Sequence, residues 1–173
     1  MGPDEAGNLS REGGDGWTTN RIGIVVLLVG IPASGKSTFV KERYSTYALL
    51  SKDLYRKSTR KYIRQALELR AFLSAGESVV VDNTHVTPAE RAEVIPIAKD
   101  YKARVVGYVF DLDVRASLAR NRLREGRAKV PDVCIYTKAK NFVPPSFEEG
   151  FDELFSVRIG PDGFDKAIYP RVP

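Results

Sequence analysis

Residues 22–38 read IGIVVLLVGIPASGKST, and this stretch decides the fold. Its first eight residues form a near-continuous apolar run, as expected of a strand buried on both faces of a parallel sheet. Gly30, Gly35, Lys36 and Ser37 then match the fixed positions of the pattern G-x-x-x-x-G-K-[ST]. An accidental glycine-rich turn rarely matches all of these positions between a strand and a helix. The stretch therefore predicts a phosphate-binding loop, or P-loop.

The P-loop predicts how a nucleoside triphosphate is bound. Its glycines allow backbone angles that point successive N–H groups at an anion, and the dipole of the following helix adds to this attraction. Lys36 is expected to reach the outer phosphates, and the Ser37 hydroxyl to ligate Mg²⁺. We expect the triphosphate to be bound through Gly30, Ala33, Ser34, Gly35, Lys36, Ser37 and Thr38. The loop alone does not separate a kinase from a GTPase or an ATPase motor.

Patterns typical of strands and of helices alternate along the rest of the chain. Runs rich in apolar residues mark the expected strands. Further strands are expected at residues 47–51, 78–82, 103–110 and 154–159. Helices are expected at residues 36–44, 57–75 and 114–124, and after a capping box at residues 87–90. This order predicts an α/β domain in which a parallel sheet of about five strands is flanked by helices.

Composition excludes several classes of protein. The chain has 173 residues, 43% of them hydrophobic, which suits one compact domain and excludes disorder along the whole chain. A single cysteine, Cys134, excludes a disulfide framework or a cysteine-based zinc site. No apolar run reaches the roughly 18 residues of a membrane span, and no signal peptide is recognised. We expect no membrane contact and a reducing compartment, cytoplasmic or nuclear.

Charge is distributed unevenly along the chain. Residues 1–20 are polar, lack periodicity and are expected to be a disordered leader or an expression remnant. The net charge is +5, but residues 1–21 carry four acids and two bases, so the rest of the chain carries +7. Eight basic residues against two acidic ones lie between Arg115 and Lys140. A basic body hints at a polyanionic partner.

Two absences favour a kinase over other P-loop proteins. The guanine-reading pattern Asn-Lys-x-Asp of GTPases does not occur, and the strand-like run before Asp82 is followed by Asn83 rather than by a water-activating Glu. We therefore expect residues 21–173 to form a single domain of the P-loop kinase fold, with an Arg-rich lid at about residues 120–131.

The turn at residues 51–56 follows the second strand, so it is expected to face the P-loop across the carboxyl edge of the sheet. Asp53 could accept a proton from an attacking hydroxyl, and Arg56 could hold an acceptor phosphate. Asp53 could equally be a helix N-cap and Arg56 a surface charge. In the lid, Arg120 and Arg124 could neutralise transferring phosphate, or could belong to a solvated helix end.

Several motifs in order resemble the kinase domain of polynucleotide 5′-hydroxyl kinases. The resemblance covers about residues 22–159 and rests on the P-loop, KDLYR (52–56), VVVDNT (79–84) before a Pro-x-Glu-Arg helix start, the Arg-rich lid, and FVPPSFEEGF (142–151). It implies transfer of the ATP γ-phosphate to a 5′-OH end of DNA or RNA with Mg²⁺, and a role in nucleic-acid repair.

The resemblance also implies a role for each residue. Asp53 is the implied general base, and Arg56 holds the phosphate after the first acceptor nucleoside. Lys36 and Arg124 would act in catalysis, and Arg120 and Arg124 would contact the donor phosphates. The floor between donor and acceptor would be lined by Asp82, Asn83 and Thr84. Arg127 receives no assigned role.

The sequence departs from the family at two positions. Lys52 replaces the usual Arg, and His85 follows Asp-Asn-Thr, where a local hydrogen-bonding role is expected. No phosphatase signature or ligase lysine motif occurs, so a repair phosphatase or ligase that accompanies this kinase would lie on a partner chain or outside the sequence given. Two alternatives stay open: a kinase for a small metabolite (a nucleoside, sugar acid or sulfated nucleotide), and a nucleotide-binding end sensor without turnover.

Overall fold

A computed structural model describes residues 22–55 and 59–171 of the chain. The leader expected at residues 1–20, and Arg56, lie outside the described residues. Within the described ranges no helix is both long and apolar enough to cross a membrane.

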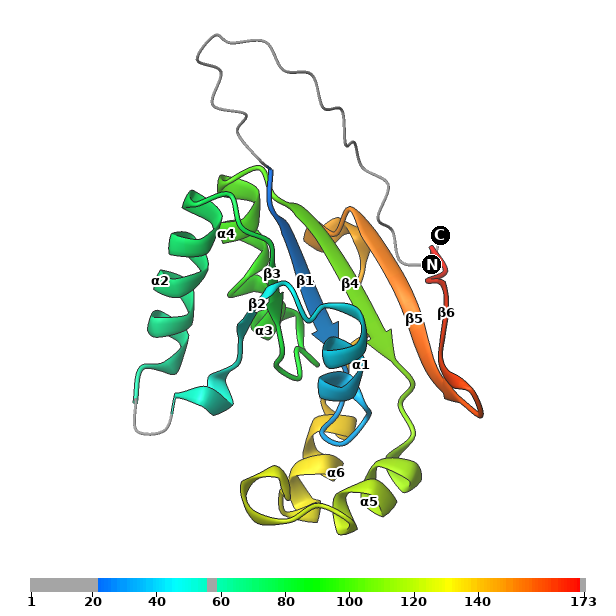
Figure 1. Ribbon diagram of the computed structural model, residues 1–173. Helices are drawn as coiled ribbons and strands as arrows, with labels where there is room; N and C mark the ends of the chain where they lie inside the picture. Colours follow the sequence, from blue (N-terminus) through cyan, green and yellow to red (C-terminus); the bar gives the residue numbers. More distant parts are fainter. Residues whose placement is uncertain (1–21, 56–58, 172–173) are drawn as a thin grey trace, which may run out of the picture.

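One sheet with the strand order β2-β3-β1-β4-β5-β6 forms the centre of the fold (Figure 1). All neighbouring strands pair in parallel except β6, which runs antiparallel to β5. The strands are β1 (Ile24–Val29), β2 (Ala48–Leu50), β3 (Val79–Val81), β4 (Arg104–Phe110), β5 (Glu153–Gly160) and β6 (Gly163–Ile168). The helices are α1 (Lys36–Arg43), α2 (Lys61–Ser74), α3 (Pro88–Ala92), α4 (Ile95–Asp100), α5 (Val114–Arg122) and α6 (Asp132–Lys140). The predicted α/β fold with a mostly parallel sheet is confirmed.

Helices cover both faces of the sheet because β1 is apolar at every position. Val25, Leu27 and Val29 pack with α2 and α4 on one face. Val26 and Leu28 pack with α1 on the other face, so the strand is buried at every position from Val25 to Val29. Burial on both sides explains why this strand reads as a continuous apolar run instead of an alternating one.

The sheet has one more strand than expected, because the run from residue 153 forms a hairpin. Its turn has Gly163 at φ 122°, and β6 then pairs with β5 from Gly163 to Ile168. Most of β6 is exposed, so it carries little of the apolar pattern from which a strand is recognised.

The helix expected after residues 87–90 is divided into α3 and α4. Thr87 caps α3 by accepting the N–H of Glu90 at 3.2 Å, as the capping box predicts. The Glu90 carboxylate, however, accepts from the N–H of Val86 at 2.8 Å rather than from Thr87. Pro96 lies in the first turn of α4, where its missing N–H is tolerated, and it prevents α3 from continuing.

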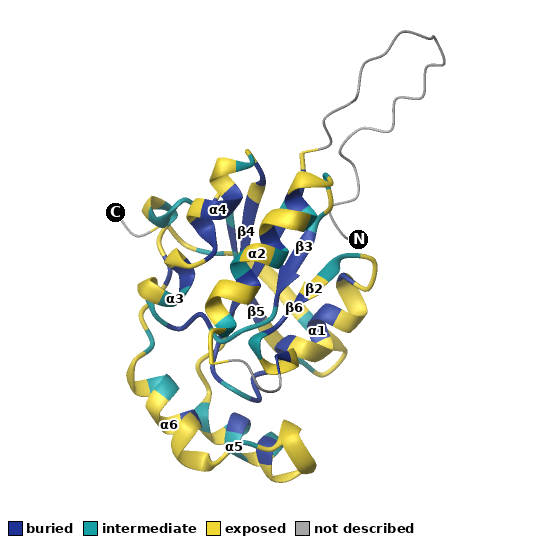
Figure 2. Cartoon of the chain, turned by 90° about the vertical axis from the view of Figure 1, so that its left-hand side faces the viewer, coloured by how far each residue is buried: buried dark blue, intermediate teal, exposed yellow. Residues whose placement is uncertain are grey.

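Helices α5 and α6 lie beyond the carboxyl ends of β1 and β4 (Figure 1). Figure 2 shows that α6 is mostly exposed, whereas α5 combines exposed, intermediate and buried residues. The buried Asn121 joins their bases, since its amide donates to Val130 O at 2.7 Å and accepts from Val130 N at 3.1 Å. In the segment predicted as a lid, hydrogen bonds between Asn121 and Val130 therefore connect the two ends of the loop. Helix α6 follows this loop and was not predicted from the sequence.

Candidate functional site

The P-loop joins β1 to α1 and is shaped by two glycines. Gly35 has φ 99°, a left-handed conformation that side chains strain. At Gly30 a Cβ atom would lie 2.9 Å from Ser34 Oγ and 3.0 Å from Phe110 Cβ. Gly30 N also donates to Thr84 O at 2.9 Å, which ties the loop to the segment after β3. The loop therefore leads into the N-terminus of α1, where backbone N–H groups can bind an anion.

Lys36 is buried under the loop that it serves. Its Nζ donates to the carbonyls of Gly30 at 2.9 Å and Ile31 at 2.6 Å. Burial lowers the pKa of Lys36 to about 8, and the nearby Asp82 carboxylate opposes this shift. The ammonium is consequently close to its titration point at neutral pH.

We expect ATP affinity to fall about tenfold between pH 7 and pH 9. With a pKa of about 8, roughly nine-tenths of Lys36 is protonated at pH 7 and roughly one-tenth at pH 9. Of the two protonation states of Lys36 only the ammonium attracts phosphate, so its contribution to ATP affinity is present below pH 8 and is lost above it. Calorimetric titration of ATP across this range measures the effect. Lys36→Arg is the control, because its guanidinium stays protonated and its affinity should change less than about twofold; a flat wild-type profile would contradict the assignment.

Ser37 and Asp82 form a hydrogen-bonded pair of oxygen-bearing side chains, next to Lys36 in the same cavity. The Ser37 hydroxyl donates to Asp82 Oδ2 at 2.8 Å. Burial raises the pKa of Asp82, and the Ser37 hydrogen bond and the charge of Lys36 oppose that rise. In the described residues no group of three or more His, Cys, Asp or Glu side chains could hold a metal alone. A hydroxyl and one carboxylate nevertheless fit Mg²⁺, which in nucleotide sites takes few protein ligands together with phosphates.

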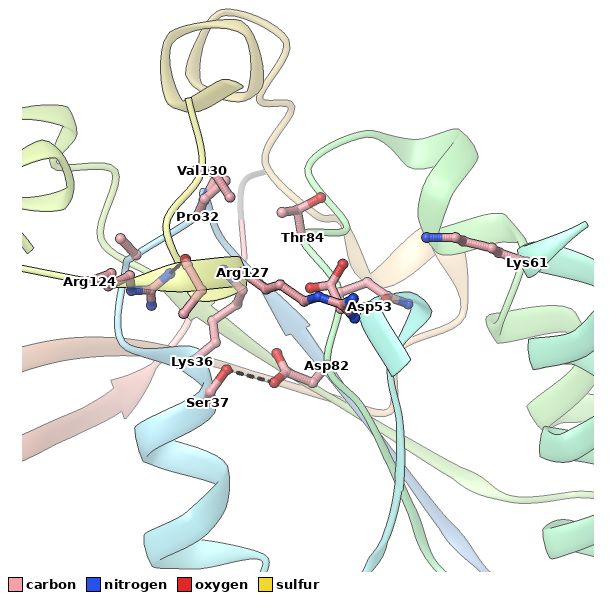
Figure 3. Close-up of a pocket in the computed structure, with 13 residues that line it drawn as sticks. Pro32, Lys36, Ser37, Asp53, Lys61, Asp82, Thr84, Arg124, Arg127 and Val130 are labelled. Atoms are coloured by element: carbon pink, nitrogen blue, oxygen red, sulfur yellow. Dashed lines mark hydrogen bonds between the residues drawn. The ribbon is translucent and has the colours of Figure 1, made fainter. Parts of the chain in front are cut away.

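A cavity of about 630 Å³ opens between the P-loop, the turn after β2, the segment after β3 and the lid loop (Figure 3). It brings together eight residues expected at the site: Ala33, Lys36, Ser37, Asp53, Asp82, Asn83, Thr84 and Arg124. Four others do not line it, namely Gly30, Ser34, Gly35 and Thr38, and neither does Arg120. The expected acceptor residue Arg56 lies outside the described residues.

Asp53 lies in the cavity and does not cap a helix. The short 3-10 turn Lys52–Leu54 is capped by Ser51, whose hydroxyl accepts from the Asp53 N–H at 3.4 Å. The Asp53 side chain is therefore left exposed in the cavity, across from the P-loop (Figure 3). Of its two sequence interpretations, this position is the one that a proton acceptor needs.

The two lid arginines lie on different sides of the P-loop. Arg124 lines the main cavity, and its charge contributes to lowering the pKa of Lys36. Arg120 instead donates from Nη1 to Ala33 O at 2.7 Å and lines a separate, smaller pocket with Ser34 and Arg158. Arg120 lies on α5, whereas Arg124 follows the end of that helix at Arg122, and the two side chains do not line one cavity.

The residues after β3 divide between lining the cavity and bracing it. The side-chain amide of Asn83 is hydrogen-bonded within the fold. Its Oδ1 accepts from Lys52 N at 3.0 Å, and its Nδ2 donates to Gln65 Oε1 at 2.7 Å. His85 is buried and bonds Leu28 O through Nδ1 at 2.9 Å. Burial lowers the pKa of His85 to about 4, so the ring is neutral and outside the cavity. Its role is local, as the sequence indicated.

A buried ion pair connects the element at residues 142–151 to this floor. Arg91 is fully buried and binds Glu149 twice, at 2.6 Å and 2.9 Å. Its Nη1 also donates to His85 O at 2.9 Å and to Val143 O at 3.1 Å. The Pro-x-Glu-Arg and Phe-Glu-Glu-Gly motifs are therefore joined by this ion pair, which we call the brace, and the brace also bonds His85 in the segment after β3.

Sequence reasoning missed the cavity residues Pro32, Lys61, Ala128 and Val130, and it named Arg127 without a role. Lys61 belongs to a basic run at the start of a helix whose phase the sequence did not define. The available signal was its spacing of four from Gln65, a polar residue on the buried face of α2.

The chain is similar to known proteins in sequence and in fold. A family model described as AAA domain matches residues 25–145. A Schizosaccharomyces pombe protein named bifunctional polynucleotide phosphatase/kinase is 30% identical over 140 residues, which is 77% of this chain and 33% of that protein. The chain thus spans about a third of the length of this curated relative.

Two solved structures share the fold at low identity. A fungal RNA kinase has a TM-score of 0.57 and 16% identity, over 79% of this chain and 38% of that one. A gluconokinase from Sinorhizobium meliloti 1021 has a TM-score of 0.55 and 15% identity, over 81% and 85% of the two chains. At these identities the likeness concerns the fold alone.

Proposed function

Because this chain belongs to the AAA domain family, we propose that it is an ATP-dependent phosphotransferase of the P-loop kinase type whose acceptor is the 5′-hydroxyl end of DNA or RNA. The observation that carries the proposal is the position of Asp53 in one cavity with Lys36, Ser37 and Arg124. A 30% identical relative named polynucleotide phosphatase/kinase supports a nucleic-acid acceptor.

The cavity supplies the groups that in-line phosphate transfer needs. The Asp53 carboxylate takes the proton of the 5′-hydroxyl as that oxygen forms its bond to the γ-phosphorus. The bond to the β–γ bridging oxygen breaks at the same time, and the charge that passes to ADP is stabilised by Lys36 and Arg124. The products are ADP and a 5′-phosphorylated end, with the proton on Asp53.

Two further features support this assignment of roles. Ser37 and Asp82 would hold Mg²⁺, which when bound supplies positive charge to the phosphates. The cavity is lined by four cationic side chains, Lys36, Lys61, Arg124 and Arg127, against the carboxylates of Asp53 and Asp82. This excess of positive charge suits two polyanionic substrates bound together.

Transfer of label from γ-labelled ATP tests the proposal directly. We expect 5′-OH DNA or RNA oligonucleotides to be labelled, and the same oligonucleotides carrying a 5′-phosphate to stay unlabelled. Nucleosides, gluconate and other sugar acids serve as competing acceptors. Labelling of one of these metabolites but of no oligonucleotide would identify a metabolite kinase. Retained ATP binding with no labelled acceptor would instead indicate an end sensor, and both results contradict the proposal.

A further inference from the structure

The cation at the start of α2 has no function in the transfer step described above. Lys36 and Arg124 line the side of the cavity where the proposed function places the donor phosphates, whereas Lys61 lines the other side of the same cavity. In Figure 3 the Lys61 side chain extends from α2 toward Asp53 and Thr84, opposite the P-loop. Lys61 therefore belongs to the acceptor side of the site.

The fold holds Lys61 in this position through the residue one turn later. Gln65 is buried and is bound by Asn83 Nδ2 at 2.7 Å, which fixes α2 against the segment after β3. Residues four apart lie on one helix face, so Lys61 lies on the face that Gln65 directs toward the site. Leu69 and Leu73 continue this face into the core.

Lys61 differs in its pairing from the basic residues around it. Lys52 is paired with Glu93. Arg64 binds Glu68 at 2.9 Å and stacks on the Tyr55 ring at 4.5 Å. Half-buried Lys61 makes no hydrogen bond or ion pair within residues 22–55 and 59–171, although two carboxylates line its cavity. A partly desolvated ammonium without an anion is poised for one supplied by a substrate.

We propose that Lys61 binds a backbone phosphate of the acceptor strand; this inference rests on the proposed function and deepens it. A lysine contacts phosphate as a point charge without reading the base, so the contact favours any polynucleotide over an alcohol that lacks phosphate. Lys61 thus makes a free nucleoside a poorer acceptor than an oligonucleotide, while the donor site is unaffected.

Binding of a labelled 5′-OH hexanucleotide without ATP, followed by fluorescence anisotropy at several salt concentrations, tests the proposal. We expect Lys61→Met to weaken binding about tenfold at low salt and to reduce the slope of log K against log salt by about 0.7, the value for one phosphate contact on a single strand. Lys61→Arg should keep most of the affinity. Lys41→Met, an exposed charge on α1 outside the cavity, should change nothing.

Several outcomes separate this inference from the proposed function. Equal hexanucleotide affinity and salt slope in Lys61→Met and wild type would overturn it. Weaker ATP binding in Lys61→Met, with unchanged hexanucleotide binding, would assign Lys61 to the donor and also overturn it. If wild type binds the hexanucleotide through Lys61 but does not phosphorylate it, the inference stands and the proposed transfer fails. No hexanucleotide binding by wild type would overturn both.

Discussion

Asp53→Asn is expected to lower kcat for phosphate transfer by about 10²- to 10⁴-fold while ATP affinity stays within about twofold. A positioned proton acceptor typically contributes a factor of this size, and an amide cannot accept the proton. ATP affinity should persist because the P-loop, Lys36 and Ser37 are untouched. The fold should persist because the exposed Asp53 side chain does not cap its turn, which Ser51 does.

Steady-state transfer to a 5′-OH oligonucleotide, with ATP binding measured by calorimetry, separates these two quantities. Asp162→Asn is the matched control, since Asp162 is an exposed carboxylate in the turn between β5 and β6, outside the cavity. Its kcat should equal that of wild type. Parallel loss of transfer and of ATP affinity in Asp53→Asn would make Asp53 a structural residue and remove the proposed base.

Arg91→Met is expected to destabilise the fold by about 3–5 kcal/mol, because it leaves the Glu149 charge without its partner in a largely buried site. The carbonyls of His85 and Val143 lose their donor at the same time. For a domain of this size the change corresponds to a fall in Tm of roughly 6–20 °C. Thermal unfolding followed by circular dichroism measures it.

Arg104→Met supplies the comparison for Arg91→Met. Arg104 pairs with Glu153 on the surface, where both side chains are about a third or more exposed. Solvent screens such pairs, so Arg104→Met should change stability by less than about 1 kcal/mol. If the two variants unfold at the same temperature, Arg91 and Glu149 do not form the brace that the contacts describe.

Features that depend on interactions between neighbouring residues were predicted from the sequence, whereas features that depend on contacts between distant residues were not. The P-loop was recognised because glycines, lysine and serine act within eight consecutive residues, and their backbone conformations follow from local sterics. The hairpin that adds β6 was missed, since its exposed strand has no apolar pattern. Helix α6 was also missed, because Ile135 is its only buried residue.

Within the candidate site, the same boundary separates what was predicted from what was not. Asp53 and Arg124 were expected near the P-loop, and both line one cavity with Lys36, since loops at the carboxyl ends of parallel strands meet at one edge of the sheet. Arg120 points to Ala33 O instead of into the main cavity, and this contact depends on a residue 87 positions away in the sequence. The bracing use of Asn83 likewise depends on Lys52 and Gln65, which lie on two other elements.

The sequence by itself therefore determined the α/β class, the phosphate-binding loop and the carboxylate at the carboxyl edge of the sheet, because strand order and local motifs suffice for these. Only the tertiary structure decided which cations share the cavity. Side chains one helical turn apart can face different neighbours, and a lysine such as Lys61 is paired or unpaired according to which distant carboxylates come within reach. That distribution of charge depends on packing between elements, which no contiguous stretch of sequence contains.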